Sequence, residues 1–320
     1  MKVFIASPYN PLGGGPESLH QWCDMINLLG GDAYMYYYDP GSSLPMNTIC
    51  INPVAPCVYT DKYSHLKRAI QIEDNKQNIL IVPEIVSIKM IRDSWSDIRM
   101  AVAWLSLQSG LPRLEEYIST PGLVHIFQSY TARKYVCAAA KEPIETCDIC
   151  DYIPDEFVLR PLNPQMRNDI VVYNAVKDRK TPEICRKLGV KSIGLDGFTW
   201  KDVRNILDIS KVYVDLGHHP GRDRIPREAA VMGCVIVTNR EGTAANFEDL
   251  PIDTRAETDE EATKFIQEAI SNHSKMYESQ KIYIESIKNQ RVKMSKQIYS
   301  FLSKVFQFVD VPCPPISMLD

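Results

Sequence analysis

Apolar positions along the first 40 residues follow the spacing of a strand, then of a helix, then of a strand again. Lys2 to Ser7 alternates apolar and small residues, which is typical of a strand, and Glu17 to Leu29 carries apolar residues at helical intervals. A proline- and glycine-rich loop, Pro8 to Pro16, separates them, and Ala33 to Tyr38 follows as a second strand. This order forms a βαβ unit, so the pattern predicts a parallel sheet.

The same alternation continues through the rest of the chain. In the first half it predicts strands at 78–82, 99–107 and 123–128. The periodicity breaks at 151–156, and a second series follows, with strands at 169–173, 192–195, 211–216 and 234–238 and helices at 182–188, 200–209 and 226–232. We therefore predict an α/β protein with two Rossmann-like, doubly wound domains, residues 1–150 and 151–320.

The C-terminal tail, residues 260–308, is predicted to be helical, with lysines and arginines mixed among apolar residues. A basic amphipathic helix can lie on an anionic membrane. It can equally pack across the first domain and leave its basic face in solvent. We favour packing and keep peripheral membrane contact as the alternative.

Composition narrows the function classes. The chain has 320 residues, 45% apolar and 24% charged, which is ordinary for a globular protein. Its net charge of -4 argues against a nucleic-acid partner, since such proteins need a positive field. No apolar run approaches the roughly 20 residues of a membrane span, and the N-terminus lacks a signal peptide's apolar core. We expect a cytoplasmic protein, with a peripheral place at the inner membrane face as the alternative.

Cysteine spacing gives little support to a metal site. The nine cysteines are scattered, and Cys147-x-x-Cys150 has the spacing of half a zinc site. No second pair stands nearby to complete four ligands. We expect reduced, structural cysteines and assign no metal and no cofactor.

The segment from Lys211 to Thr238 carries the chemistry. A buried strand ends in a loop that feeds a helix with Pro226 in its first turn, a position that suits proline. A helix start attracts anions, and the carboxyl end of a parallel strand is where α/β proteins bind ligands. The guanidinium groups of Arg222, Arg224 and Arg227 suit diphosphate oxygens, and Glu228 can accept hydrogen bonds from ribose hydroxyls.

At these residues the chain resembles a known group. Arg-Glu-Ala-Ala-x-x-Gly-Cys-x-Ile-x-Thr at 227–238, followed by Glu-Gly-Thr-Ala-Ala-Asn at 241–246, resembles the donor-binding end of GT-B glycosyltransferases. The similarity is to the glycosyltransferase family 4-like group and uncharacterised relatives from bacterial surface-polysaccharide loci. It implies two domains facing a central cleft and transfer of a sugar from a UDP- or GDP-sugar to a glycan or lipid-linked acceptor, in surface polysaccharide or lipopolysaccharide synthesis.

The resemblance also implies roles for individual residues. Glu228 occupies the place of the glutamate that binds the donor ribose. The stretch 170–180 resembles the strand-and-lysine motif that opens the second domain, in which a basic residue contacts the donor phosphates. The loop before the first helix resembles one that lies against the donor phosphate or the acceptor. The implied donor-binding residues are therefore Gly13, Gly14, Gly15, Asn174, Lys177, Lys180, His219, Gly221, Arg222, Arg224, Arg227 and Glu228.

The chain departs from the family at one position. An acidic residue usually stands eight positions before the helix glutamate, and here that position is Pro220. The sugar and the stereochemical outcome are therefore open. Glu84, after a first-domain strand, is the candidate base of an inverting reaction, and His219 is the second candidate catalytic residue.

Three alternatives stay open at this stage. His219-Pro220 also resembles the pair with which sialyltransferases and Kdo transferases hold a CMP phosphate, which allows a CMP-sugar transferase. A nucleotide-sugar epimerase on the same scaffold is a second alternative. A non-catalytic protein that binds nucleotides or glycans is the third.

Overall fold

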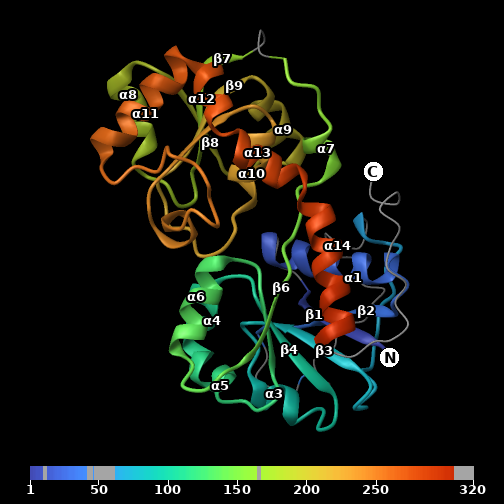
Figure 1. Cartoon of the computed structure of the whole chain (residues 1–320). Coiled ribbons are helices and arrows are strands. Elements are labelled where there is room, and N and C mark those ends of the chain that lie inside the picture. Colours follow the sequence, from blue (N-terminus) through green and yellow to red (C-terminus); the bar gives the residue numbers. More distant parts are fainter. Residues whose placement is uncertain (10–12, 42–45, 47–61, 164–166, 306–320) are drawn as a thin grey trace. The chain divides into compact units, whose positions relative to one another are not determined.

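The computed structural model describes residues 1–9, 13–41, 46, 62–163 and 167–305. The chain divides into two compact units (Figure 1). Unit 1 comprises Met1–Tyr152 and Arg291–Asp320, and unit 2 comprises Ile153–Gln290. The predicted break at 151–156 contains this division.

Unit 1 is built on a parallel sheet whose described strands run in the order β2-β1-β3-β4-β5-β6. Val3 and Ile5 of β1 belong to one apolar cluster, while Phe4 and Ala6 belong to another, because alternate side chains of a strand point to opposite faces. The sheet is therefore covered on both faces, which explains its nearly unbroken apolar strands. The strands are β1 (Val3–Pro8), β2 (Ala33–Tyr38), β3 (Ile79–Pro83), β4 (Arg99–Trp104), β5 (Val124–Phe127) and β6 (Glu145–Asp148).

The helices of unit 1 connect these strands and cover them. The helical elements are α1 (Gly14–Leu28), α3 (Ile88–Arg92), α4 (Leu107–Gly110), η2 (Leu111–Arg113), α5 (Leu114–Ile118) and α6 (Tyr130–Ala139). Residues 105–107, predicted as the end of a strand, instead turn into α4. Ser106 causes this change, since its hydroxyl accepts a hydrogen bond from the Ser109 amide and caps the helix.

Helix α14 (Gln290–Ser300), which is followed by the short π-helix η5 (Phe301–Val305), packs into unit 1 from Arg291 onward. Its residues Met294 and Ile298, with Phe301 of η5, are fully buried in the same cluster as Trp22 of α1. Helix α14 accordingly lies beside α1 (Figure 1). Spacings of four and three residues put these side chains on one helical face. The prediction assigned 151–320 to the second domain, whereas the structure groups the residues from 291 onward with unit 1. Residues 306–308 of the predicted tail lie outside the described residues.

Unit 2 contains a parallel sheet whose described strands run in the order β10-β9-β7-β8. The strands are β7 (Asn168–Asn174), β8 (Lys191–Leu195), β9 (Ser210–Asp215) and β10 (Val235–Thr238). The helical elements are α7 (Asp155–Val158), α8 (Thr181–Leu188), α9 (Trp200–Asp208), α10 (Arg224–Val231), η4 (Gly242–Ala245), α11 (Asp259–Ser271), α12 (His273–Ser279) and α13 (Lys281–Lys288). Within the described residues, the predicted helical tail comprises the α-helices α11 to α14 and the π-helix η5.

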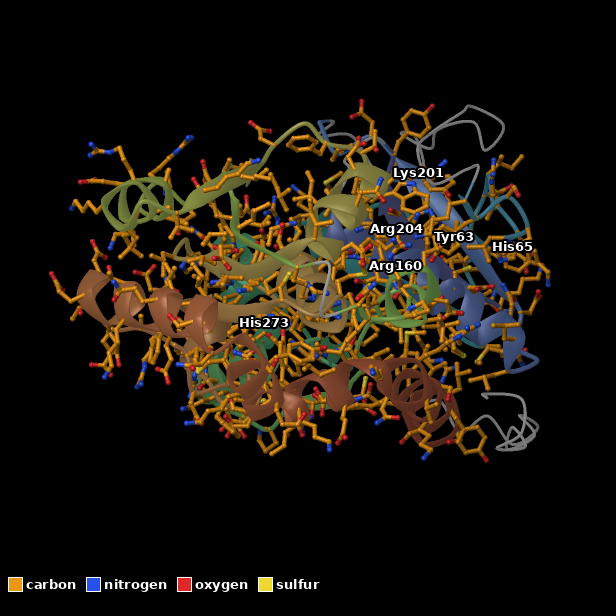
Figure 2. The ribbon with its side chains drawn as sticks, turned by 90° about the horizontal axis from the view of Figure 1, so that it is seen from above. Tyr63, His65, Arg160, Lys201, Arg204 and His273 are labelled. Atoms are coloured by element: carbon orange, nitrogen blue, oxygen red, sulfur yellow. The ribbon has the colours of Figure 1, made fainter. Side chains whose placement is uncertain are left out.

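Helix α9 shows how local sequence fixes an element of unit 2. Thr199 and Asp202 form a reciprocal capping box at its start. Lys201 and Arg204, labelled in Figure 2, each place their cation 5.5 Å from the ring centroid of Trp200. Charge and aromatic surface thus pair on the exposed side of this helix.

In the part of the chain that is described, no helix is both long and apolar enough to cross a membrane.

Candidate functional site

The candidate site lies where three neighbouring strands of unit 2 end. β9 pairs in parallel with β7 and with β10, and Asp215 at the end of β9 stands opposite Thr238 at the end of β10. The loop 216–223 leaves β9 at this edge and leads into α10, which starts at Arg224. Ligands of parallel α/β sheets bind at the carboxyl ends of the strands, so the topology places this loop where a ligand is expected.

Four residues with ionisable side chains form a cluster at this loop, which we call the Lys177 cluster: Lys177, Asp215, His219 and Asp223. The Lys177 ammonium lies 3.0 Å from Oδ2 of Asp215 and 2.5 Å from Oδ2 of Asp223. It also donates to the carbonyl of His218 at 3.0 Å. An ammonium group has three hydrogens, so these acceptors engage all of its donors.

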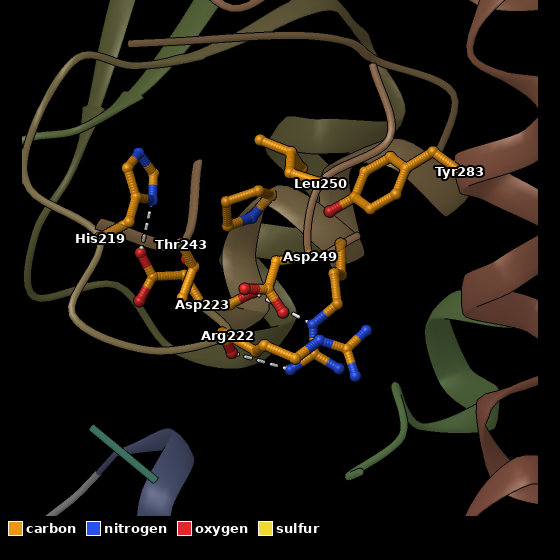
Figure 3. Close-up of a pocket in the computed structure, with 9 residues that line it drawn as sticks. His219, Arg222, Asp223, Thr243, Asp249, Leu250 and Tyr283 are labelled. Carbon is orange, nitrogen blue, oxygen red and sulfur yellow. Dashed lines mark hydrogen bonds and ion pairs between the residues drawn. The ribbon is translucent and has the colours of Figure 1, made fainter. Parts of the chain in front are cut away.

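His219 is held from both sides within the cluster. Its Nδ1 lies 2.8 Å from Oδ2 of Asp223 (Figure 3), and its Nε2 lies 3.2 Å from the backbone carbonyl of Asp215. The ring is thereby anchored to both ends of the loop that leads from β9 to α10. The ring is 3% exposed, and it belongs to the lining of the pocket that also contains Arg222.

The cluster shifts the pKa values of its acidic and basic groups. Burial raises the pKa of Asp215, against the opposing charges of His219 and Lys177. Burial acts in the same direction on Asp223, but the hydrogen bond from His219 and the charge of Lys177 outweigh it and lower the pKa of that carboxyl. Burial alone would lower the pKa of Lys177, yet the two aspartates raise it. The Lys177 ammonium and the two carboxylates are therefore coupled through their ion pairs.

Hydrogen bonds from neighbouring segments fix the loop 216–223. Asp178, which is buried, accepts a bond from the Leu216 amide at 2.9 Å and another from the Thr181 hydroxyl at 2.6 Å. Thr243 of η4 donates its amide to the carbonyl of His219 at 2.9 Å and its hydroxyl to the carbonyl of Gly221 at 2.8 Å. The loop is thus tied to the segments that follow β7 and β10.

The three predicted arginines have different surroundings. Arg227 is 2% exposed and donates to the carbonyls of Asp223 and Arg222 and to the side chain of Gln290. Arg224 lies 3.4 Å from Glu228 on the next turn of α10. Arg227 therefore holds the loop from within, in contrast to the diphosphate role predicted for it.

Arg222 is the arginine whose side chain is most available to a ligand. It is partly exposed and lines a pocket with His219, Thr243 and Tyr283 (Figure 3). Among the described residues its guanidinium makes no ion pair or hydrogen bond. A cation that has no ion-pair partner in the described part of the chain, beside the start of α10, favours an anionic ligand.

The remaining predicted residues of unit 2 lie near the same edge with other tasks. Lys180 is exposed and pairs with Asp259 at 2.9 Å. Asn174 ends β7 and accepts a hydrogen bond from the Val176 amide at 3.1 Å, which forms a tight turn. The structure therefore brings Lys177, His219, Gly221, Arg222, Arg224, Arg227 and Glu228 together around one loop and leaves Lys180 in a surface ion pair.

The other predicted site residues belong to unit 1. Gly13, Gly14 and Gly15 stand at the start of α1. Glu84 is buried after β3, and its two carboxylate oxygens accept hydrogen bonds from the amides of Leu105, at 3.1 Å, and Ser106, at 2.9 Å. Burial raises the pKa of Glu84 to about 7 although these bonds act to lower it. This geometry gives Glu84 a role in holding the turn after β4, and its role as a base stays a prediction.

Sequence reasoning did not select Asp215, Asp223, Asp178 or Thr243. A signal for two of them was present: Asp215, His219 and Asp223 follow one another at intervals of four residues across a strand end and a loop. Asp178 and Thr243 act through backbone amides and carbonyls, which no spacing reveals.

Comparisons with known proteins agree with this geometry at the level of the fold. Anabaena HepE in complex with UDP is 12% identical, with a TM-score of 0.62 over 95% of this chain and 100% of that one. The E. coli trehalose-6-phosphate protein bound with UDP-2-fluoro glucose is 12% identical, with a TM-score of 0.56 over 97% of this chain and 100% of that one. The chain has the GT-B fold. The prediction of two Rossmann-like α/β domains is confirmed.

A further similar structure is longer than this chain. A variant of S. aureus TarM, in complex with Fondaparinux, alpha-GlcNAc-glycerol and UDP, matches with a TM-score of 0.54 and 12% identity over 73% of this chain. The present chain spans little more than half of TarM, 56% of its length. No protein-family model matches the chain, and no curated protein sequence matches it.

Proposed function

We propose that this chain is a glycosyltransferase that binds a nucleotide-diphosphate sugar at loop 216–223 and the start of α10. The observation that carries the proposal is the place of Arg222: a guanidinium without an ion pair among the described residues, at the carboxyl edge of a parallel sheet, beside a helix start. As the glycosidic bond breaks, negative charge grows on the departing diphosphate. A cation already in position stabilises that charge.

Glu228 supports the ribose end of the same proposal. It lies on the second turn of α10 and is 8% exposed. Its Oε1 pairs with Arg224 at 3.4 Å, while its Oε2 accepts no hydrogen bond from the described residues. A carboxylate oxygen in that state can accept hydrogen bonds from ribose hydroxyls.

The structural neighbours favour a uridine nucleotide. HepE was solved with UDP and with UDP-glucose, the E. coli protein with UDP-2-fluoro glucose, and the TarM variant with UDP. We extend the proposal to a UDP-sugar donor on this ground. A glycan or lipid-linked acceptor in surface polysaccharide synthesis rests on the sequence resemblance.

Isothermal titration calorimetry with UDP, GDP and CMP tests the donor site. We expect UDP to bind, and Arg222→Ala to weaken its affinity about 10- to 100-fold, the range for a lost charge-assisted hydrogen bond. Arg186→Ala is the matched control, because Arg186 is an exposed arginine in the last turn of α8. If none of the three nucleotides binds the wild-type protein, the proposal is wrong.

A second assay separates catalysis from mere binding. A transferase with a bound donor and no acceptor slowly passes the sugar to water, so UDP-glucose should release free UDP at a rate that Arg222→Ala reduces. Tight UDP binding without any release of UDP from a panel of UDP-sugars would favour a non-catalytic protein. Conversion of the sugar to an epimer would favour an epimerase.

A further inference from the structure

The Lys177 cluster contains the donor set of a divalent-cation site. One oxygen each from Asp215 and Asp223 and a ring nitrogen of His219 all lie within 4.8 Å of one another. Carboxylates and imidazole are ligands that Zn²⁺ and Co²⁺ accept, with bonds of about 2.0 to 2.2 Å. Two ligand atoms bound to the same ion are at most about 4.4 Å apart. The three side chains would therefore need to approach one another by only about half an ångström to bind such an ion. No second group of this kind occurs among the described residues.

The position of the cation is already taken by a side chain. The Lys177 ammonium lies 3.0 Å and 2.5 Å from the two carboxylates. Its methylene stem lies against Gly217, where a Cβ atom would come 2.8 Å from Cγ of Lys177. Any larger residue at 217 would push the stem away. The backbone of the loop is therefore shaped to admit this amine.

We propose that Lys177 is a resident cation: its ammonium fills a carboxylate–imidazole site for a divalent metal, excludes the metal and closes the loop 216–223. In this role Lys177 is a positioning residue rather than a ligand of the donor phosphates.

Charge and burial explain why the amine stays in place. Contact with a phosphate would draw Lys177 away from at least one of its three acceptors. Asp215 has no solvent exposure, and a buried carboxylate without a counter-ion is strongly unfavourable. A metal ion entering the native cluster would have to displace the Lys177 ammonium. The positive charges of the metal and of Lys177 would then lie close together and repel each other. The ion pairs of Lys177 with Asp215 and Asp223 therefore oppose both contact of Lys177 with a phosphate and entry of a metal ion.

Removal of the amine should therefore convert the cluster into a metal site. Lys177→Ala leaves both carboxylates and the imidazole in place, and Co²⁺ reports its ligands through visible d–d absorption. We expect the variant to bind one Co²⁺ per chain, roughly tenfold or more tighter than the wild type. We also expect its melting temperature to fall and Co²⁺ to restore it.

Two further variants serve as controls. Lys180→Ala removes an exposed lysine of the same segment, paired with Asp259 outside the cluster, and should gain no Co²⁺ binding. Asp223→Asn combined with Lys177→Ala removes one ligand and should abolish the absorption band. Should Lys177→Ala fail to fold by circular dichroism, Lys177→Met keeps the stem against Gly217 while it removes the charge.

Two results would overturn the proposal. Equal Co²⁺ affinity of wild type and variant would show that Lys177 does not occupy the site. A folded Lys177→Ala or Lys177→Met that binds no Co²⁺ would show that the three ligands form no site. Because this experiment needs no nucleotide, its outcome is independent of whether the chain binds a nucleotide-sugar.

Discussion

A glycine next to the candidate site offers a quantitative test of the structure. Gly242 begins η4 with φ of +58°, and a Cβ atom there would lie 1.9 Å from the carbonyl oxygen of His219. The clashing group is backbone, so no side-chain rotation relieves it. Gly242→Ala can fit only if η4 moves away from the loop 216–223.

The cost has three parts. The left-handed backbone costs an alanine about 1 to 2 kcal/mol. Forcing the extra carbon into a packed contact costs about 1 to 3 kcal/mol. Moving η4 breaks the hydrogen bond from the Thr243 amide to the His219 carbonyl, worth about 1 kcal/mol. We therefore expect Gly242→Ala to lower the free energy of unfolding by about 3 to 6 kcal/mol.

Gly197 supplies the matched control. It lies in the same unit with φ of +71°, and nothing stands within 4 Å of its added Cβ. Gly197→Ala should therefore cost only the backbone part, about 1 to 2 kcal/mol. The difference between the two variants, about 2 to 4 kcal/mol, isolates the contact with His219.

Urea unfolding followed by far-UV circular dichroism measures both variants, provided that the slopes with denaturant agree. Hydrogen exchange adds a local measurement, since the Thr243 amide should lose protection in Gly242→Ala and keep it in Gly197→Ala. Equal destabilisation by the two substitutions would refute the close contact between η4 and the loop.

Three further predictions concern unit 1. Phe301→Ala should lower its stability by about 3 to 5 kcal/mol in urea unfolding, because Phe301 is fully buried; Leu28→Ala, at a side chain of α1 that is 61% exposed, should change stability by less than about 0.5 kcal/mol. Burial lowers the pKa of His20 to about 4, so its neutral ring stabilises the native state fully above about pH 6.5 and loses about 3 kcal/mol as pH falls to 4; His20→Asn should flatten that part of the stability–pH curve. Burial raises the pKa of Glu84 to about 7, so the stability contributed by its protonated form is lost as pH rises from about 4.5 to 7, opposite in sign to the effect of His20. Glu84→Gln should remove that loss, and an unchanged dependence of stability on pH would contradict a buried carboxyl at this position.

The fold was predictable from sequence wherever strands are buried on both faces. β2 begins and ends at the predicted residues, because Ala33 to Tyr38 is an apolar run between turn signals. β6 was not predicted, since Glu145–Asp148 is a polar strand at the sheet edge and carries no apolar pattern. The apolar stripe of α14 predicted a helix, and packing across the first domain was favoured over a membrane surface. The structure buries Met294 and Ile298 of α14 in unit 1, in agreement with that prediction.

The candidate site shows a different limit. Sequence reasoning assigned all the basic residues near this loop the same role, which was contact with the donor. In the structure Lys177 and Arg227 turn inward, because buried carboxylates and backbone carbonyls offer them partners. The side chain of Arg222 has no such partner among the described residues.

The basic residues at this loop therefore have two roles, either to hold the backbone or to contact a ligand. Substitution should accordingly lower either stability or nucleotide binding. An inward cation holds the backbone, so its removal should first lower stability and alter what the Lys177 cluster can bind. The side chain of Arg222 bonds to no backbone group among the described residues. Its removal should therefore weaken nucleotide binding and leave the unfolding free energy nearly unchanged. Fold and site are linked here through the loop: the buried charges fix the backbone that presents Arg222 beside the start of α10. Under the proposed function, the departing diphosphate would meet a cation that is already in place, an arrangement that stabilises developing charge.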